Sequence, residues 1–170
     1  CYEHTNKLKY SIMPALRKMK SSSVEVSLYY VQVVDYLSEI TKAILHITRP
    51  AFEHIDNNHK GLSQEQVDDL MRINDAVAEI YGMINRMLVT NDFRDIDDVL
   101  TLRDELFEHI AETTKSELQR ITAGEGNTKA SMFYLTVLSE TKAMVLQARN
   151  LLKAQRYFLE HAGVQKNWTK

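Results

Sequence analysis

The chain has 170 residues, of which 21 are Lys or Arg, 23 are Asp or Glu and 44% are hydrophobic, and its formal net charge is −2. This length and composition are typical of one globular domain. The basic residues are scattered along the chain, so the sequence has no electrostatic footprint for nucleic acid. The only cysteine is Cys1, which excludes an internal disulfide and a thiolate zinc site and favours a reduced, cytosolic setting.

The first residues and the hydropathy of the chain indicate whether a further segment precedes it and whether it spans a membrane. The sequence begins Cys-Tyr-Glu-His, without Met and without a signal peptide, so we expect further coding sequence upstream of Cys1. The apolar segment from 28 to 47 carries Asp35, Glu39 and Lys42, whereas a membrane span needs about 18 uncharged residues. These 170 residues are therefore predicted to be soluble.

Five Gly and two Pro in the whole chain are too few for the many tight turns of a β-sandwich or barrel, and favour long helices. The first long helix is predicted from apolar residues that recur every three or four positions: Tyr30, Val33, Leu37, Ile40, Ile44, Ile47, Ala51 and Ile55. Pro50 lies within this series, and we expect it to kink or break the helix before a short continuation to about Asn58.

A second helix is predicted after Gly61, where Ser63 and Gln66 have the spacing of a capping box. Its apolar face keeps the same three-four spacing: Val67, Leu70, Asn74, Val77, Tyr81, Ile84 and Leu88. Asn74 is the one polar residue of that face, and we expect it to fix the register of packing rather than to do chemistry.

The third helix is predicted to begin near Asp95 and Asp98, whose charges suit a helix N-terminus. Its apolar face is made of residues that thin out along the chain: Ile96, Val99, Leu102, Leu106, Ile110, Leu118 and Ile121. We therefore expect its distal half to be polar and solvated. The Gly-Glu-Gly sequence at 124–126 is predicted to end this helix.

The last helix, capped by Asn127 or Thr128, carries two apolar stripes and should be central. One stripe is Leu135, Leu138, Val145, Leu152 and Leu159, and the other is Phe133, Val137, Met144, Leu151 and Phe158. Short loops force antiparallel neighbours. The sequence thus predicts an all-α fold: an up-down-up-down bundle of four long helices at 23–162, after a connector with a short helix at 1–22 and before a flexible tail at 163–170.

Catalytic signatures are missing from the sequence. It has no glycine-rich phosphate loop, no nucleophile elbow and no His-Glu-x-x-His motif. A di-iron bundle needs Glu-x-x-His on two helices, and this chain has none. The sequence therefore argues against an enzyme and predicts no catalytic residues.

Two groups of side chains could bind a metal ion. Asp35 and Glu39 are one helical turn apart, a spacing that lets two carboxylates reach one hard cation, with ordinary solvated charges as the alternative. Residues 53–59, Glu-His-Ile-Asp-Asn-Asn-His, are the densest in potential ligands. Their spacing matches no metal motif, and a polar helix end with surface histidines is the simpler interpretation.

Three segments resemble the PhoU family. Residues 30–40, Tyr-Val-Gln-Val-Val-Asp-Tyr-Leu-Ser-Glu-Ile, resemble its signature helix, and residues 133–142, Phe-Tyr-Leu-Thr-Val-Leu-Ser-Glu-Thr-Lys, resemble a degenerate second copy. With residues 52–60, they make the region from about 23 to 160 similar to a PhoU-like cytoplasmic tail. Such tails follow the membrane part of bacterial sodium/phosphate cotransporters or inorganic phosphate permeases.

The resemblance implies two three-helix repeats, a regulatory or scaffolding role in phosphate uptake, and metal binding by acidic pairs one turn apart. Asp35 and Glu39 match such a pair with Glu in place of the second Asp, and Met144 stands one turn after Glu140 in the second copy. A divalent or iron-type metal ion would then be held by Asp35, Glu39 and Glu140, which would meet across the first and last long helices.

The sequence leaves two classes of function open. The first is a non-catalytic regulatory and interaction domain of an inorganic phosphate transporter, on the cytoplasmic side of the bacterial inner membrane, whose partner is the membrane part of that transporter. The second is a stand-alone PhoU-like protein, either a metal-binding regulator or a helical adaptor. The face of the second helix packs inside the bundle or against a second copy, so a homodimer is open.

Overall fold

The computed structural model describes residues 2–16 and 24–161. They form five helices, α1 (Tyr2–Leu16), α2 (Val24–Asp56), α3 (Gln64–Thr90), α4 (Ile96–Thr122) and α5 (Thr128–His161). Within these residues there is no strand, so the predicted all-α fold, with a short leading helix before four long ones, is confirmed. The end of the predicted connector and the predicted tail at 163–170 lie outside the described residues.

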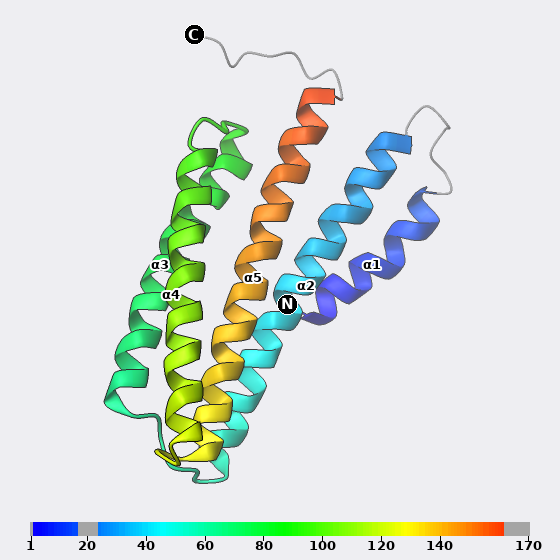
Figure 1. Ribbon diagram of the computed structural model, residues 1–170. Helices are drawn as coiled ribbons and strands as arrows, with labels where there is room; N and C mark the ends of the chain where they lie inside the picture. The colour runs from blue at the N-terminus through cyan, green and yellow to red at the C-terminus, as the bar shows by residue number, and fades with distance from the viewer. Residues whose placement is uncertain (1, 17–23, 162–170) are drawn as a thin grey trace.

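The four long helices alternate in direction along the chain (Figure 1). α3, α4 and α5 each contact the other two, which makes them a three-helix bundle. Among the described helices, α2 contacts α5 on one side and α1 on the other, and it contacts neither α3 nor α4. The fold is therefore an up-down-up-down bundle in which α5 alone joins α2 to the other long helices.

The core lies along α5 and the facing sides of α3 and α4. Six of its largest side chains are at most 1% exposed: Ile80, Val99, Tyr134, Leu138, Val145 and Leu152. Four of these six belong to α5, in agreement with the expectation that the last helix is central. Complete burial of one such side chain contributes about 1.5–3 kcal/mol, so this helix dominates the apolar stabilisation of the bundle.

Local sequence sets the helix starts. The Ser63 hydroxyl accepts a hydrogen bond from the Gln66 amide at 3.3 Å, and the Gln66 side chain accepts one from the Ser63 amide at 2.9 Å. This confirms the predicted capping box, which satisfies two otherwise unpaired amides. The Asn127 side chain accepts hydrogen bonds from the amides of Lys129 and Ala130, so Asn127 rather than Thr128 caps α5.

α2 runs through Pro50 as one uninterrupted helix and ends at Asp56, so the break allowed for at Pro50 does not occur. A proline inside a helix removes one amide donor, here the one that would reach the carbonyl of His46. His46 is exposed, and water can satisfy its carbonyl. The surface position of this turn explains why the helix tolerates the proline.

The packing face of α3 includes most of the predicted one but leaves out Asn74. Ile84 is buried, and the core contacts four other predicted residues: Leu70, Val77, Tyr81 and Leu88. Its buried apolar residues are Ile73, Ile80, Ile84 and Met87, and Asn74 is exposed. The expectation that Asn74 fixes the register inside the bundle is therefore wrong. Packing against both α4 and α5 buries a strip wider than the predicted one, which adds Ile73, Ile80 and Met87.

The distal half of α4 is also partly buried, contrary to expectation. Thr113 and Glu117 are 9% and 3% exposed and continue the line of Leu106 and Ile110 toward the helix end. The buried face of α4 therefore changes from apolar to polar side chains along the helix and stays buried. The hydrogen bonds that Glu117 makes, described below, account for its burial.

We expect Ile80→Ala to lower the free energy of unfolding by about 2–5 kcal/mol, because Ile80 is 0% exposed and truncation leaves a cavity. Urea titration followed by circular dichroism measures the change. Val89→Ala is the matched control on the same helix, since Val89 is 74% exposed, and it should change stability by less than about 0.5 kcal/mol. Equal effects of the two substitutions would contradict the described core.

Candidate functional site

The predicted acidic pair on α2 is engaged by lysines. Asp35 Oδ1 lies 2.7 Å from Nζ of Lys9 in α1, and Glu39 Oε1 lies 2.5 Å from Nζ of Lys42. The hydrogen bond and charge of Asp35 raise the pKa of Lys9 above its usual value. Asp35 therefore ties α1 to α2, and both carboxylates have cationic partners.

Glu140 lies at a different level of the bundle. Its Oε1 is 3.4 Å from Nδ1 of His46 on α2, whereas Glu39 lies seven residues earlier on α2, about 10 Å along a helix axis. Ligands of one hard cation must all lie within about 2.6 Å of it. The described part of the chain holds no group of three or more His, Cys, Asp or Glu side chains placed to share a metal ion, so the trio of Asp35, Glu39 and Glu140 has no geometric support.

The histidine-rich end of α2 is held by ring contacts. The His54 ring stacks on Phe133 of α5 at 5.3 Å between centroids and meets the edge of the His59 ring at 5.2 Å. The His54 Nε2 lies 2.9 Å from the Lys60 carbonyl oxygen. Desolvation, followed by the charges of Lys129 and His54, lowers the pKa of His59. These contacts fasten the loop after α2 to the start of α5.

A buried polar network, which sequence analysis missed, joins α3 to α4. Gln66 and Glu117 are 4% and 3% exposed, and Gln66 Nε2 donates a hydrogen bond of 2.9 Å to Glu117 Oε1. Arg120 Nη1 lies 3.4 Å from Glu117 Oε2 and 3.6 Å from Glu65 Oε2. One cation and one amide thus compensate the buried carboxylate, as burial of a charge requires.

Tyr134 extends this polar region toward α5. It is 1% exposed, and its hydroxyl donates a hydrogen bond of 3.2 Å to Asp69 Oδ2. Desolvation, the neighbouring Asp69 and the charges of Glu117 and Glu65 raise the pKa of Tyr134. The spacing of the sequence could have indicated this region. Glu117 lies seven residues after Ile110, which was expected on the apolar face of this helix, and therefore shares that face.

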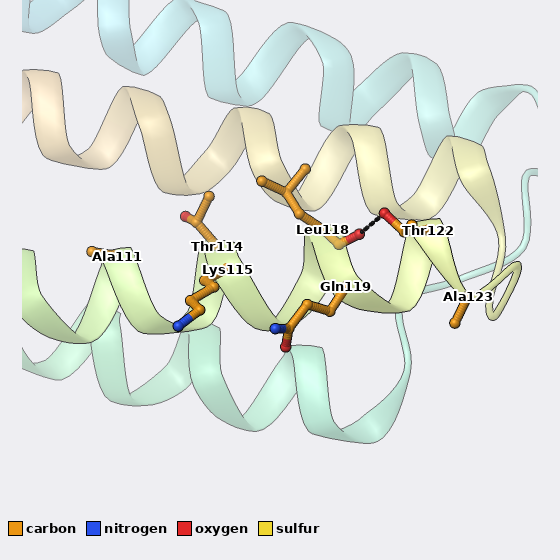
Figure 2. A pocket seen from close by; sticks show the side chains of 7 residues that line it. All are labelled: Ala111, Thr114, Lys115, Leu118, Gln119, Thr122 and Ala123. Atoms are coloured by element: carbon orange, nitrogen blue, oxygen red, sulfur yellow. Dashed lines mark hydrogen bonds between the residues drawn. The ribbon is translucent and has the colours of Figure 1, made fainter.

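The groove along the C-terminal half of α4 is lined by few polar groups (Figure 2). Its lining residues come from α4 and its C-cap: Ala111, Thr114, Lys115, Leu118, Gln119, Thr122 and Ala123. Thr114 and Leu118 point to one side of the helix, and Lys115 and Gln119 to the other. The polar groups of the lining are one ammonium, one amide and two hydroxyls, and the Thr122 hydroxyl donates to the Leu118 carbonyl oxygen within the helix.

Large apolar side chains are exposed along the second half of α2. We call the face that they form the open face and define it by Ile44, Thr48, Phe52 and Ile55, which are spaced at helical intervals. Ile44, Phe52 and Ile55 are 42%, 68% and 75% exposed. Exposed apolar side chains that gather on one face, rather than lying scattered, are a feature of interaction sites.

Comparisons of the chain with protein-family models, with curated proteins and with solved structures found no match. A search of the described helices for a segment both long and apolar enough to cross a lipid bilayer found none.

We expect Glu117→Ala to lower the free energy of unfolding by about 1–3 kcal/mol, because it leaves the buried side-chain amide of Gln66 without a hydrogen-bond acceptor. Glu117→Gln retains an acceptor oxygen and should cost less. The exposed Glu112 on the same helix gives the control Glu112→Ala, with a change below about 0.5 kcal/mol. Urea unfolding measures all three, and a Glu117→Ala protein as stable as the wild type would exclude the network as a stabilising contact.

We expect stability to fall in alkali as the pH rises through about 10, the pKa of tyrosine in an unfolded chain. Burial raises the pKa of Tyr81 and Tyr134, so these hydroxyls stay protonated in the folded protein while they ionise in the unfolded chain. The variant Tyr81→Phe/Tyr134→Phe should therefore lose less stability between about pH 9 and about pH 11 than the wild type does. Chemical unfolding at several pH values measures this.

The control for the alkaline experiment is Tyr10→Phe, because Tyr10 is 81% exposed. It should show the same pH dependence as the wild type. If the double variant and the wild type lost stability in parallel, the two buried hydroxyls would not be the groups that titrate on unfolding.

Proposed function

We propose that the chain is a non-catalytic regulatory and interaction domain of an inorganic phosphate transporter, lying on the cytoplasmic side of the bacterial inner membrane. The resemblance of residues 30–40 and 133–142 to the PhoU family supports the link to phosphate. The open face of α2 supports the role in protein interaction, and it is the observation that carries the proposal.

Regulation by such a domain requires that the transporter have two conformations. A domain can bias a transporter only if it binds one conformation of the membrane part more tightly than the other. α2 is suited to transmit a difference of this kind, because α5 is the only long helix that it contacts. A shift of α2 along α5 would move the open face and leave the bundle of α3, α4 and α5 in place.

The first test is the full coding sequence upstream of Cys1. The proposal expects several apolar segments of about 20 residues there, each long enough to span a bilayer. A coding sequence without such segments would overturn the proposed link to a transporter and favour a stand-alone helical adaptor.

We expect deletion of residues 1–170 from the full-length transporter to change phosphate uptake, or its dependence on external phosphate, by about fivefold. This factor corresponds to a coupling free energy of about 1 kcal/mol. Phe52→Asp, on the open face, should reproduce the effect of the deletion. Initial rates of radiolabelled phosphate uptake in whole cells measure both.

Met71→Asp is the matched control for Phe52→Asp. Met71 is 63% exposed on α3, so the substitution places the same charge at an exposed apolar position away from the open face. It should leave uptake unchanged. Uptake that is the same with and without the domain would contradict the proposed function.

A further inference from the structure

One stripe of positions runs along the side of α2 that is turned away from α5. Tyr29 and His54 of α2 stack on rings of α5. Ser38 lies nine residues after Tyr29, and Leu45 lies nine residues before His54. Nine residues make about two and a half helical turns, so Ser38 and Leu45 lie on the side opposite α5. The other positions of the stripe continue their spacing of three or four residues: Val34, Thr41, Thr48, Phe52 and Ile55.

α1 covers the first half of this stripe (Figure 1). Lys9 of α1 lies 2.7 Å from Asp35, and Thr5 of α1 lies 3.0 Å from Thr41. Ser38, between these two contacts, is 1% exposed. Among the described helices only α1 and α5 contact α2. Since α5 lies on the opposite side, α1 accounts for the burial of Ser38.

The second half of the stripe is exposed. Leu45, Phe52 and Ile55 are 37%, 68% and 75% exposed. The change from covered to exposed falls where α1 begins, because Thr41 is opposite Thr5 in the first turn of α1. The exposed half therefore continues an interface that α1 already forms with α2.

The exposed half can be covered by a helix without loss of a hydrogen bond. Its large side chains are apolar, and their burial is favourable. The one hydroxyl, that of Thr48, donates to the Ile44 carbonyl oxygen at 2.9 Å. This bond lies within α2, so a helix packed over Thr48 would leave the donor paired.

α1 points in the direction in which such a cover would extend. Thr5 contacts Thr41. Lys9, which comes later in α1, contacts Asp35, which comes earlier in α2. The two helices are therefore antiparallel, and the start of α1 points toward Ile55. Ile55 lies fourteen residues beyond Thr41, so a continuation of α1 that begins about ten residues upstream of the first residue would reach it.

We propose that the open face of α2 binds the segment of the polypeptide directly upstream of Cys1, folded as a helix continuous with α1. The inference rests on the proposed function, which places further chain before Cys1 and treats the open face as an interaction surface. In the proposed transporter this segment connects the membrane part to the domain. A movement of the connecting helix would then act directly on α2.

Continuity is the argument for this occupant over another molecule. The covered and exposed halves of the stripe share one spacing and one side of α2, and a helix of the same chain already binds the covered half. A segment joined to α1 is held beside the open face at a high effective concentration. It therefore needs less intrinsic affinity for this face than a second copy or the membrane part does.

Thiol labelling of Phe52→Cys, in a chain that also carries Cys1→Ser, tests the proposal. Two chains are compared: residues 1–170, and the same residues preceded by about twelve native residues, with any further cysteine replaced by serine. A maleimide should label the shorter chain rapidly, because Phe52 is 68% exposed. It should label the longer chain at least about tenfold more slowly, because the thiol is then reached only by local opening.

Met71→Cys is the matched control, since Met71 is 63% exposed on α3, and it should be labelled at the same rate in both chains. Circular dichroism gives a second measurement. The longer chain should contain about ten more helical residues, and Phe52→Asp should remove this gain because it places a charge in an apolar contact. Equal labelling of Phe52→Cys in the two chains would overturn the proposal.

Two other outcomes would also overturn it. Labelling of the shorter chain that slows as its concentration rises would assign the open face to a second copy. Slow labelling found only in the full-length transporter would assign it to the membrane part. Phosphate uptake distinguishes this failure from that of the proposed function: if deletion of residues 1–170 alters uptake while the two chains are labelled equally, the proposed function stands without this contact.

Discussion

The structure depends on one constraint: α5 must be covered on two sides. Its core side, which includes Tyr134 and Leu152, is closed by α3 and α4, and a second side is closed by α2. No other described helix contacts three of the long helices. Because apolar burial is the main source of folding free energy, the position of every other long helix follows from the two sides of α5. α1 is the exception, since it reaches the fold only through α2.

Polar contacts set the register that apolar packing leaves free. Aliphatic side chains can repack against one another at modest cost when a helix shifts, whereas displacing Gln66 would leave the buried Glu117 without its amide partner. Gln66 also closes the capping box of α3, so the same side chain fixes where α3 begins and how it lies against α4. At the other end of α3, Gln155 of α5 donates to the Leu88 carbonyl and to the Asn91 side chain. Each end of α3 is thus held by one amide side chain.

Much of the fold could be predicted from the sequence, because helix periodicity and capping are local. The helices, their order and the capping box followed from spacing alone. The packed face of α3 followed only in part, since the burial of Ile73 and the exposure of Asn74 depend on how α3 lies against two other helices. The site was less predictable. Asp35 and Glu39 share a side of α2, as expected, but a one-dimensional pattern could not show that lysines engage them. Nor could it show that an apolar series on α2 would remain partly uncovered, because periodicity describes a face and not its neighbour.

The dependence of α2 on α5 has a consequence for biosynthesis. α3, α4 and α5 follow one another in the sequence and contact one another, so their association closes only short loops, which is fast. α2 leaves the ribosome before them, yet its partner in the bundle is α5, the last of the five described helices in chain order. At about 5–20 residues per second, the apolar side of α2 waits several seconds for α5. During that interval the apolar side of α2 is uncovered, which is the condition in which nascent chains aggregate or bind chaperones.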